Sequence, residues 1–521
     1  MKRSRTWSRS FLAISVVGLV VVGLLLAALA AALSPGERVR PVVPEPIALP
    51  GPRLGDPTPP SPEEWLDPWL SAEGTRMDDV LEAIPWLATL PEVGGPDALL
   101  ASLERALPER PGRDVAIRMA RAIGGDEDAV AALFAGAHAE APERGACFAL
   151  GVLRSASVDG ARAFEREAEL HDDDRARRLA LEAALNAGAD DELERLLADP
   201  AYAAVADAEI PYRLARRRLD WVGMLIWTMP SQHVDTPLHF LLLGILSGIL
   251  WLVVLAYLGD VRRVASARLG LCVAALVLGA ASTVPTLVLS VWMEEVLGVR
   301  EPSGLYTGIA YYVGSVGLRE ELCKLLAFLP LAPFVIRRGD PREALVVAGC
   351  VGLGFAAEEN IGYFTRSGGA DVAGRFLTAN FGHVVSTGLI GAWLCRAVKE
   401  PKHLQDFALV FIGLVIGHGV YDALIIVPEL EEWSALAGIV YVAVALLYFA
   451  QLAKCPPAAP RRVPVTAVFV YGLTAMLVTS LVAAAWDVGF LPALRTIVPG
   501  VLSAALFIFV FIRELREPLS P

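Results

Sequence analysis

The sequence predicts an all-α protein, in which a polytopic bundle of membrane-spanning helices follows an exported, solenoid-like helical domain. Hydrophobic residues make up 55% of the 521 residues and charged residues only 20%, a balance too apolar for an ordinary soluble protein. Apolar stretches long enough to span a bilayer recur from residue 238 to residue 512, whereas residues 63–237 alternate short amphipathic segments with polar turns. The net charge of −12 offers no basic surface for nucleic acid, so we expect no nucleic-acid partner.

Residues 1–33 are predicted to be a signal anchor or a signal peptide. A basic start, MKRSRTWSRS, precedes an apolar run from Phe11 to Leu33. Because this run is longer than the apolar region of a usual signal peptide, an uncleaved anchor is favoured, although the small residues of ALAAAL offer a cleavage site. Residues 34–62 are rich in proline (PVVPEPIALPGPRLGDPTPPSP) and are predicted to form an extended linker.

Residues 63–237 are predicted to form an exported helical domain. Apolar residues recur at helical spacing in segments of about 10–15 residues, separated by short turns of Gly, Asp and Pro. This organisation resembles HEAT or TPR arrays, and it is compatible with a surface for a protein partner and, equally, with a plain helical spacer. The segment PYRLARRRLDWVGMLIWTMP near its end sets arginines beside tryptophans, which is typical of a helix lying at the membrane surface.

Residues 238–512 are predicted to form a polytopic membrane domain, followed by a cytoplasmic tail at residues 513–521. Counted with the first apolar run, the chain has about nine to ten predicted spans. Those of the membrane domain lie at about 238–258, 269–293, 306–336, 343–365, 374–397, 405–428, 434–453, 463–486 and 489–512.

The loops between the spans predict the topology. Basic residues gather in alternate loops, DVRRVASAR, RRGDPR, RAVKEPKH and PRRV, whereas the other loops include MEEVLGVREP and PELEEW. Because basic loops remain in the cytoplasm, we expect a multi-pass protein of the cell (inner) membrane with both termini cytoplasmic and residues 34–237 outside.

Four consecutive spans, between residues 306 and 428, contain ionisable side chains within their apolar stretches. A charge at the bilayer centre costs roughly 2.5–3.5 kcal/mol on insertion scales, so such residues are typically functional. A rise of 1.5 Å per residue places them roughly 9–20 Å from the outer ends of their spans, close enough in depth to form one layer. They are Glu320, Glu321 and Lys324, then Glu358 and Glu359, then His383, then His418 with Asp422.

Spacing within each helix predicts local pairs. Lys324 follows Glu320 by four residues and Glu321 by three, so its ammonium can pair with either carboxylate. His418 and Asp422 share a helix face, where the carboxylate can orient the imidazole or act as a ligand. Spacing alone does not distinguish Glu320 from Glu321 as the group that does the chemistry.

Two histidines with one or more glutamates are typical of a zinc site that keeps an open position for water. A further glutamate is then the natural base for that water. The same groups also function without a metal, with a glutamate activating water and a histidine stabilising an oxyanion.

These residues resemble the pattern of the PrsW family of intramembrane proteases, which is related to the CAAX-prenyl endopeptidase and bacteriocin-processing superfamily. That pattern has an EExxK helix, an FxxxEN segment, a lone histidine in the next span, and a final histidine closely followed by aspartate. Here the four parts are EELCK at 320–324, FAAEEN at 355–360, NFGHVVSTG with His383, and HGVYD at 418–422. They occur in this order, in four successive spans, and the resemblance covers about residues 240–450.

The resemblance implies cleavage of a membrane-anchored protein, such as an anti-sigma factor, within the lipid bilayer. It implies that Glu320 or Glu321 is the base, with Lys324 as the counter-charge. Metal or water would be held by Glu359, His383 and His418, with zinc as the candidate cofactor. The supporting residues would be Asn360, Tyr363 and Asp422.

Two other functions are compatible with buried ionisable residues in a membrane. A proton- or cation-coupled transporter needs the same residue types, but it would favour inverted repeats, and the two halves of this chain show no such symmetry. A non-catalytic sensor or scaffold would act through the exported domain, and the buried charges would then be structural ion pairs.

Overall fold

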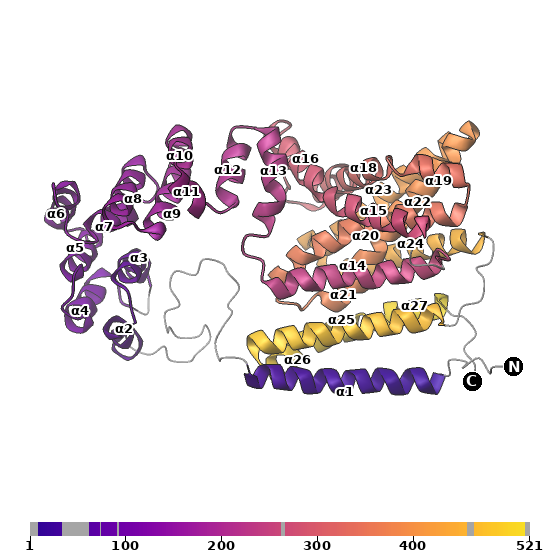
Figure 1. Ribbon diagram of the computed structural model, residues 1–521, viewed down its shortest axis with the longest axis horizontal. Coiled ribbons are helices and arrows are strands. Elements are labelled where there is room, and N and C mark those ends of the chain that lie inside the picture. Colours follow the sequence, from indigo (N-terminus) through magenta and orange to yellow (C-terminus); the bar gives the residue numbers. More distant parts are fainter. Residues whose placement is uncertain are drawn as a thin grey trace. The chain divides into compact units, whose positions relative to one another are not determined.

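The computed structural model describes residues 9–33, 62–72, 74–90, 93–261, 266–455 and 463–515. Every regular element in these ranges is a helix (Figure 1). The chain divides into two compact units. We call Val42–Val234 the helical unit, and Met1–Pro41 together with Asp235–Pro521 the membrane unit. The predicted linker at 34–62 lies outside the described residues except for Pro62.

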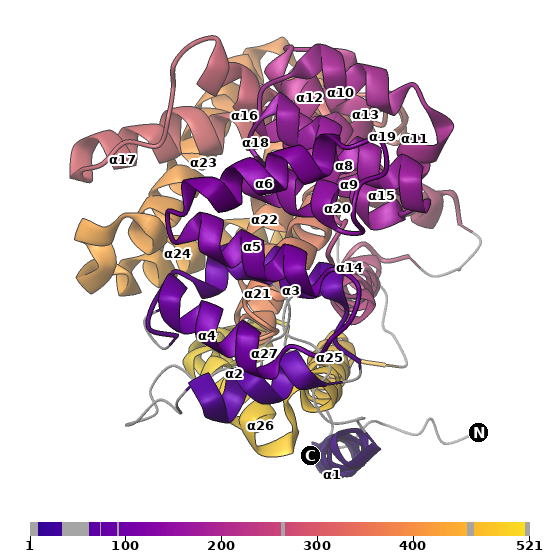
Figure 2. The ribbon, with the colours of Figure 1, turned by 90° about the vertical axis from the view of Figure 1, so that its left-hand side faces the viewer.

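The helical unit consists of short helices, most of which pack on the next helix along the chain, as Figure 2 shows for α4, α5 and α6. Polar caps help to start them: Asp126 accepts a hydrogen bond from the amide of Ala129, and Ser157 accepts one from that of Gly160. Whether the unit is a HEAT- or TPR-like array stays a prediction. Its helices are α2 (Pro62–Ser71), α3 (Met77–Leu87), α4 (Pro96–Ala106), α5 (Arg113–Ile123), α6 (Glu127–His138), α7 (Ala146–Leu153), α8 (Val158–His171), α9 (Asp174–Asn186), α10 (Asp190–Leu197), α11 (Pro200–Val205), α12 (Glu209–Arg217) and α13 (Trp221–Gln232).

The membrane unit confirms the predicted polytopic helical bundle. Among the described residues, 8 helices are long and apolar enough to cross a membrane, or 9 if the bent pair α26 and α27 is one span. The unit contains α1 (Arg9–Leu33), α14 (Leu238–Leu258), α15 (Ala267–Ala281), α16 (Thr283–Glu295), α17 (Leu305–Tyr311), α18 (Leu318–Phe328), α19 (Ala332–Arg338), α20 (Pro341–Arg366), α21 (Val372–Leu377), α22 (Ala379–Lys399), α23 (Leu404–Ile426), α24 (Ala435–Ala453), α25 (Val465–Val488), α26 (Phe490–Ser503) and α27 (Ala505–Glu514). Two short 3₁₀ segments are η2 (Pro401–His403) and η3 (Pro428–Trp433).

The predicted span at 306–336 is helical but irregular. It begins as α17, passes through a π-helix, η1 (Tyr312–Gly317), and continues as α18, before a break that precedes α19. Because α18 has four charged side chains, this segment is not among the 8 helices that are apolar enough to cross a membrane. A π-helical turn within an α-helix is frequent at functional sites, and here it lies directly before Glu320 and Glu321.

Helix α20 is the centre of the bundle, packed against α14, α15 and α22 (Figure 1). Glycines let its backbone approach its neighbours directly. A Cβ at Gly352 would lie 2.0 Å from the carbonyl oxygen of His383, which only a glycine avoids. This close approach brings the residues of α20 next to His383 on α22.

A second close approach joins η1 to α23. A Cβ at Gly419 would lie 2.4 Å from the Cα atom of Val313, and one at Gly317 would lie 2.7 Å from the carbonyl oxygen of Val415. Because η1 leads directly into α18, this packing sets Glu320 and Glu321 beside His418.

Helix α1 lies alongside α25 and contacts α26 (Figure 1). Ala27 is fully buried there and packs with Leu481, Ala485 and Ile497. Whether α1 is retained as an anchor in the mature protein stays a prediction.

Candidate functional site

The polar residues of the four charge-bearing spans meet in one cluster of the membrane unit, formed by α18, α20, α22 and α23. Among the described residues, one group of side chains could hold a metal ion: Glu320, His383 and His418. Its ligand atoms all lie within 4.8 Å of one another. The three residues come from three different helices, α18, α22 and α23, so the packing of the bundle brings them together.

Lys324 lies at the centre of the cluster and is fully buried. Its Nζ atom is 2.8 Å from Glu321 Oε1, 3.4 Å from Glu320 Oε2 and 2.7 Å from His383 Nδ1. The ammonium also lies 4.4 Å from the ring centroid of Phe355, within the range of a cation–π interaction. One buried cation therefore faces two carboxylates, an imidazole and an aromatic ring.

Glu321 is the more tightly held of the two adjacent carboxylates, with no exposed surface. Its Oε1 atom accepts hydrogen bonds from Lys324 and from Ser386 Oγ at 3.1 Å, and it lies 2.8 Å from His418 Nδ1. Its Oε2 atom is buried and has no hydrogen-bond partner among the described residues. A buried carboxylate oxygen without a donor is costly, so a group besides the described side chains is the natural partner of Oε2.

Glu320 is held more loosely and is 7% exposed. The groups nearest to its Oε2 atom are Lys324 Nζ at 3.4 Å and His418 Nε2 at 3.5 Å. The carboxylate of Glu320 can therefore bind a further partner. Of the two glutamates, Glu320 is the one that belongs to the group that could hold a metal ion.

His418 is oriented from both sides by carboxylates. Nδ1 lies 2.8 Å from Glu321 Oε1, while Nε2 lies 3.3 Å from Asp422 Oδ2 and 3.5 Å from Glu320 Oε2. A proton on Nδ1, donated to Glu321, leaves the Nε2 lone pair facing Glu320. Histidines that bind metals usually donate their other nitrogen to a carboxylate in this way.

His383 uses both ring nitrogens within the protein. Because an ammonium only donates hydrogen bonds, Nδ1 accepts the one from Lys324. The proton of the neutral ring is then on Nε2, which lies 3.2 Å from Glu359 Oε2. His383 could therefore bind a metal ion only by giving up one of these two contacts.

Arg375 is the main residue of the cluster that sequence reasoning missed. It lies on the short helix α21, and its Nη2 atom is 2.7 Å from Glu359 Oε2 while Nε donates to Asn360 Oδ1 at 2.6 Å. Its guanidinium lies 3.5 Å from the ring centroid of Tyr363. Arg375 therefore ties together three residues that the sequence had singled out. The available signal was an arginine soon after the glutamate-bearing span, at the start of the predicted span 374–397.

Asn360 links the cluster to the rest of the bundle. Its Nδ2 atom donates to Asn380 Oδ1 at 3.0 Å, and Asn380 in turn donates to Ser247 Oγ on α14 at 2.6 Å. All three side chains are buried. This chain of hydrogen bonds holds α20, α22 and α14 in register near the cluster.

Glu320, His383 and His418 are residue types that commonly bind zinc. Two imidazoles and one carboxylate are a common catalytic zinc set that leaves a position open, and Glu321 supplies the expected carboxylate behind His418. Glu359, expected as a ligand, lies outside the metal-capable group and instead pairs with Arg375 and His383. The same side chains also fit metal-free chemistry in which Glu320 takes a proton from water.

The comparison with known families found a match over part of the membrane unit. Residues 267–452 match the model of a family described as PrsW family intramembrane metalloprotease. The matched range runs from α15 to α24 and contains every residue of the cluster. No curated protein and no solved structure matches the chain.

Proposed function

Because residues 267–452 belong to the PrsW family of intramembrane proteases, we propose that the cluster of α18, α20, α22 and α23 is the active site. There it hydrolyses a peptide bond in a membrane-anchored protein substrate, of the anti-sigma-factor kind. The observation that carries this proposal is the grouping of Glu320, His383 and His418 within 4.8 Å inside a multi-pass bundle.

In this proposal Glu320 is the general base. It is the more exposed of the two carboxylates and is loosely held, so water reaches it before it reaches Glu321. As the water oxygen attacks the carbonyl carbon, Glu320 accepts the proton, and His418 Nε2 is near enough to pass a proton toward the leaving amine. Glu321 orients His418, and Lys324 balances the charge of the two carboxylates.

The two histidines and the residues behind them complete the site. Once His418 Nε2 has received the proton from Glu320, its imidazolium can stabilise the oxyanion, whereas both ring nitrogens of His383 are already engaged within the protein. Glu359, itself held by Arg375, fixes the ring of His383. These contacts support a preorganised arrangement, in which little has to move when the substrate binds.

A metal ion, if bound, would be held by Glu320, His383 and His418. Zinc would lower the pKa of a water molecule and polarise the scissile carbonyl. Elemental analysis of the purified protein tests this part separately. One zinc per chain that is lost in a His383→Ala/His418→Ala variant supports a metalloprotease, whereas full activity without zinc supports a glutamate-based hydrolase.

Cleavage of a tagged single-span substrate tests the proposed function. We expect Glu320→Gln and His418→Ala each to lower the rate by a factor on the order of 100 or more, since each removes a group from proton transfer. Matched controls are Glu429→Gln and His403→Ala, which change the same residue types outside the cluster and should cleave normally. Wild-type rates in both cluster variants would refute the proposal.

A further inference from the structure

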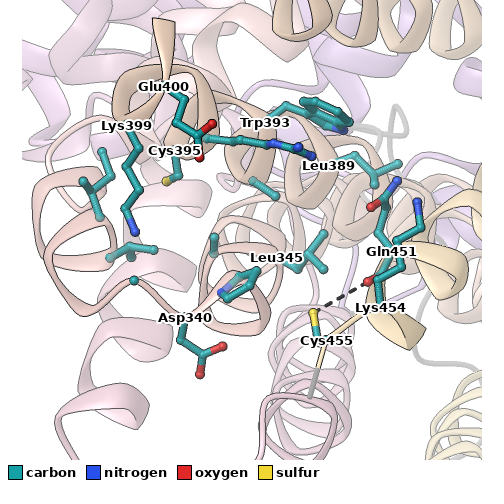
Figure 3. Close-up of a pocket in the computed structure, with 17 residues that line it drawn as sticks. Asp340, Leu345, Leu389, Trp393, Cys395, Lys399, Glu400, Gln451, Lys454 and Cys455 are labelled. Carbon is teal, nitrogen blue, oxygen red and sulfur yellow. Dashed lines mark hydrogen bonds between the residues drawn. The ribbon is translucent and has the colours of Figure 1, made fainter. Parts of the chain in front are cut away.

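A cavity of about 340 Å³ lies in the membrane unit, apart from the cluster (Figure 3). It is formed where α19, α22 and α24 end and α20 begins. No residue of the proposed active site lines it. Two of the loops beside it are RRGDPR and RAVKEPKH, which are among the basic loops that predict the cytoplasmic face.

Apolar side chains line part of the cavity and include Leu345, Leu389 and Trp393. Three cations, Arg396, Lys399 and Lys454, also line it, and the two lysines lie on opposite sides of the space in Figure 3. All three cationic residues are exposed. A cavity lined by both apolar and basic side chains suits an amphipathic anion.

The two acidic residues of the cavity are already paired with other groups. Asp340 accepts hydrogen bonds from Arg268 Nη2 at 2.7 Å and from the amide of Arg342 at 2.9 Å. Glu400 pairs with Lys402 Nζ at 2.8 Å. Neither carboxylate is within salt-bridge distance of a cation that lines the cavity.

The three lining cations form no ion pair with any residue that the structure describes. The guanidinium of Arg396 lies over the Trp393 ring, 5.0 Å from its centroid. Three cations outside any ion pair around one cavity favour an occupant with negative charge. In a membrane protein, basic pockets between helix ends on the cytoplasmic side are typical sites for anionic lipid head groups.

We propose that this cavity binds an anionic phospholipid. The phosphate lies among Arg396, Lys399 and Lys454, and the start of the acyl chains lies against Leu345, Leu389 and Trp393. An anionic phospholipid at the border of a bilayer contacts both the charged and the apolar lining residues. The assignment does not depend on the proposed proteolysis.

Native mass spectrometry of the purified full-length chain in detergent tests this proposal. The protein is titrated with phosphatidylglycerol and, separately, with uncharged phosphatidylcholine. Wild-type protein should prefer phosphatidylglycerol by about tenfold or more, because each basic side chain contributes to binding an anionic head group. The variant Lys399→Gln/Lys454→Gln should lose most of that preference.

The control variant is Arg337→Gln/Arg513→Gln. It removes the same charge from two exposed residues that do not line the cavity, and it should keep the wild-type preference. The proposal is overturned if wild-type protein shows no preference, if the cavity variant keeps it, or if both variants lose it equally. Displacement of the lipid by an equal concentration of glycerol 3-phosphate would also overturn it, because the site would then bind a free phosphate.

Discussion

Glu320 and Glu321 are neighbours in sequence, yet their surroundings differ. Glu321 is enclosed by Lys324, Ser386 and His418, whereas Glu320 has few close partners and some exposure. The spacing of EELCK could not separate them, because both carboxylates reach Lys324 along the helix. The difference arises from contacts with α22 and α23, which depend on how the helices pack.

We predict that Glu321→Gln destabilises the protein, whereas Glu320→Gln mainly stops catalysis. Removing the charge of Glu321 leaves Lys324 without its closest carboxylate, and breaking a buried ion pair costs about 3–5 kcal/mol. Thermal unfolding of the purified variants measures this. A midpoint for Glu321→Gln equal to that of Glu320→Gln would contradict the assignment.

A second prediction concerns Arg375, which positions His383 through Glu359. Arg375→Gln should lower kcat about tenfold or more, the usual effect of losing a partner behind a site residue, with little change in KM. Arg375→Lys should restore part of kcat, because an ammonium can still pair with Glu359.

The matched control for Arg375 is Arg366→Gln. Arg366 also lies over the Tyr363 ring, with its guanidinium 4.6 Å from the centroid, but no ion pair joins it to Glu359 in the described residues. Equal losses in the two glutamine variants would mean that Arg375 acts only by packing on Tyr363.

The sequence could predict pairs within one helix but not those between helices. The pairing of Lys324 with Glu321 and of His418 with Asp422 follows from helical periodicity. The contacts of His383 with Lys324, of His418 with Glu321 and of Glu359 with Arg375 join different helices. These contacts depend on how each helix is rotated about its axis and on where two helices cross, and the sequence pattern of one helix determines neither.

At the scale of the helices, the spacing of apolar residues did not predict the π-helix η1 or its packing on α23. A π-turn is set by one extra residue in the helical hydrogen-bond register, and periodicity averaged over a span does not detect it. The contact of Gly419 with Val313 is equally local, yet it fixes where His418 lies relative to Glu320.

We therefore predict that Gly419→Ala impairs both stability and cleavage. Its Cβ would lie 2.4 Å from the Cα of Val313, so α23 or η1 has to move and His418 shifts with it. Gly413→Ala, on the same helix, is the control, because no atom lies within 4 Å of its added Cβ. Thermal unfolding and substrate cleavage should separate the two variants, and equal behaviour would contradict the role of this packing.

For the molecule as a whole, composition was sufficient to predict an all-α polytopic bundle. Composition alone did not determine the number of spans. The segment that contains α18 is interrupted by charged residues, and α26 and α27 form a bent pair. The helical unit has its own core, and its role in recruiting a protein partner stays a prediction.

The predicted topology can be tested by cysteine labelling. The six native cysteines are buried, and burial raises the pKa of the Cys147 thiol to about 11, so background labelling should be low. An impermeant maleimide should label Glu127→Cys in intact cells, but Lys402→Cys only after the membrane is opened. The reverse pattern would invert the topology.

The most direct test of the central claim is hydrolysis in a purified system. The full-length protein is reconstituted in liposomes with a single-span substrate, and the products are weighed by mass spectrometry. The wild-type protein should yield two fragments whose masses sum to that of the substrate plus one water, and Glu320→Gln should yield almost none. Intact substrate with the wild-type protein, or equal cleavage by Glu320→Gln, would contradict the account.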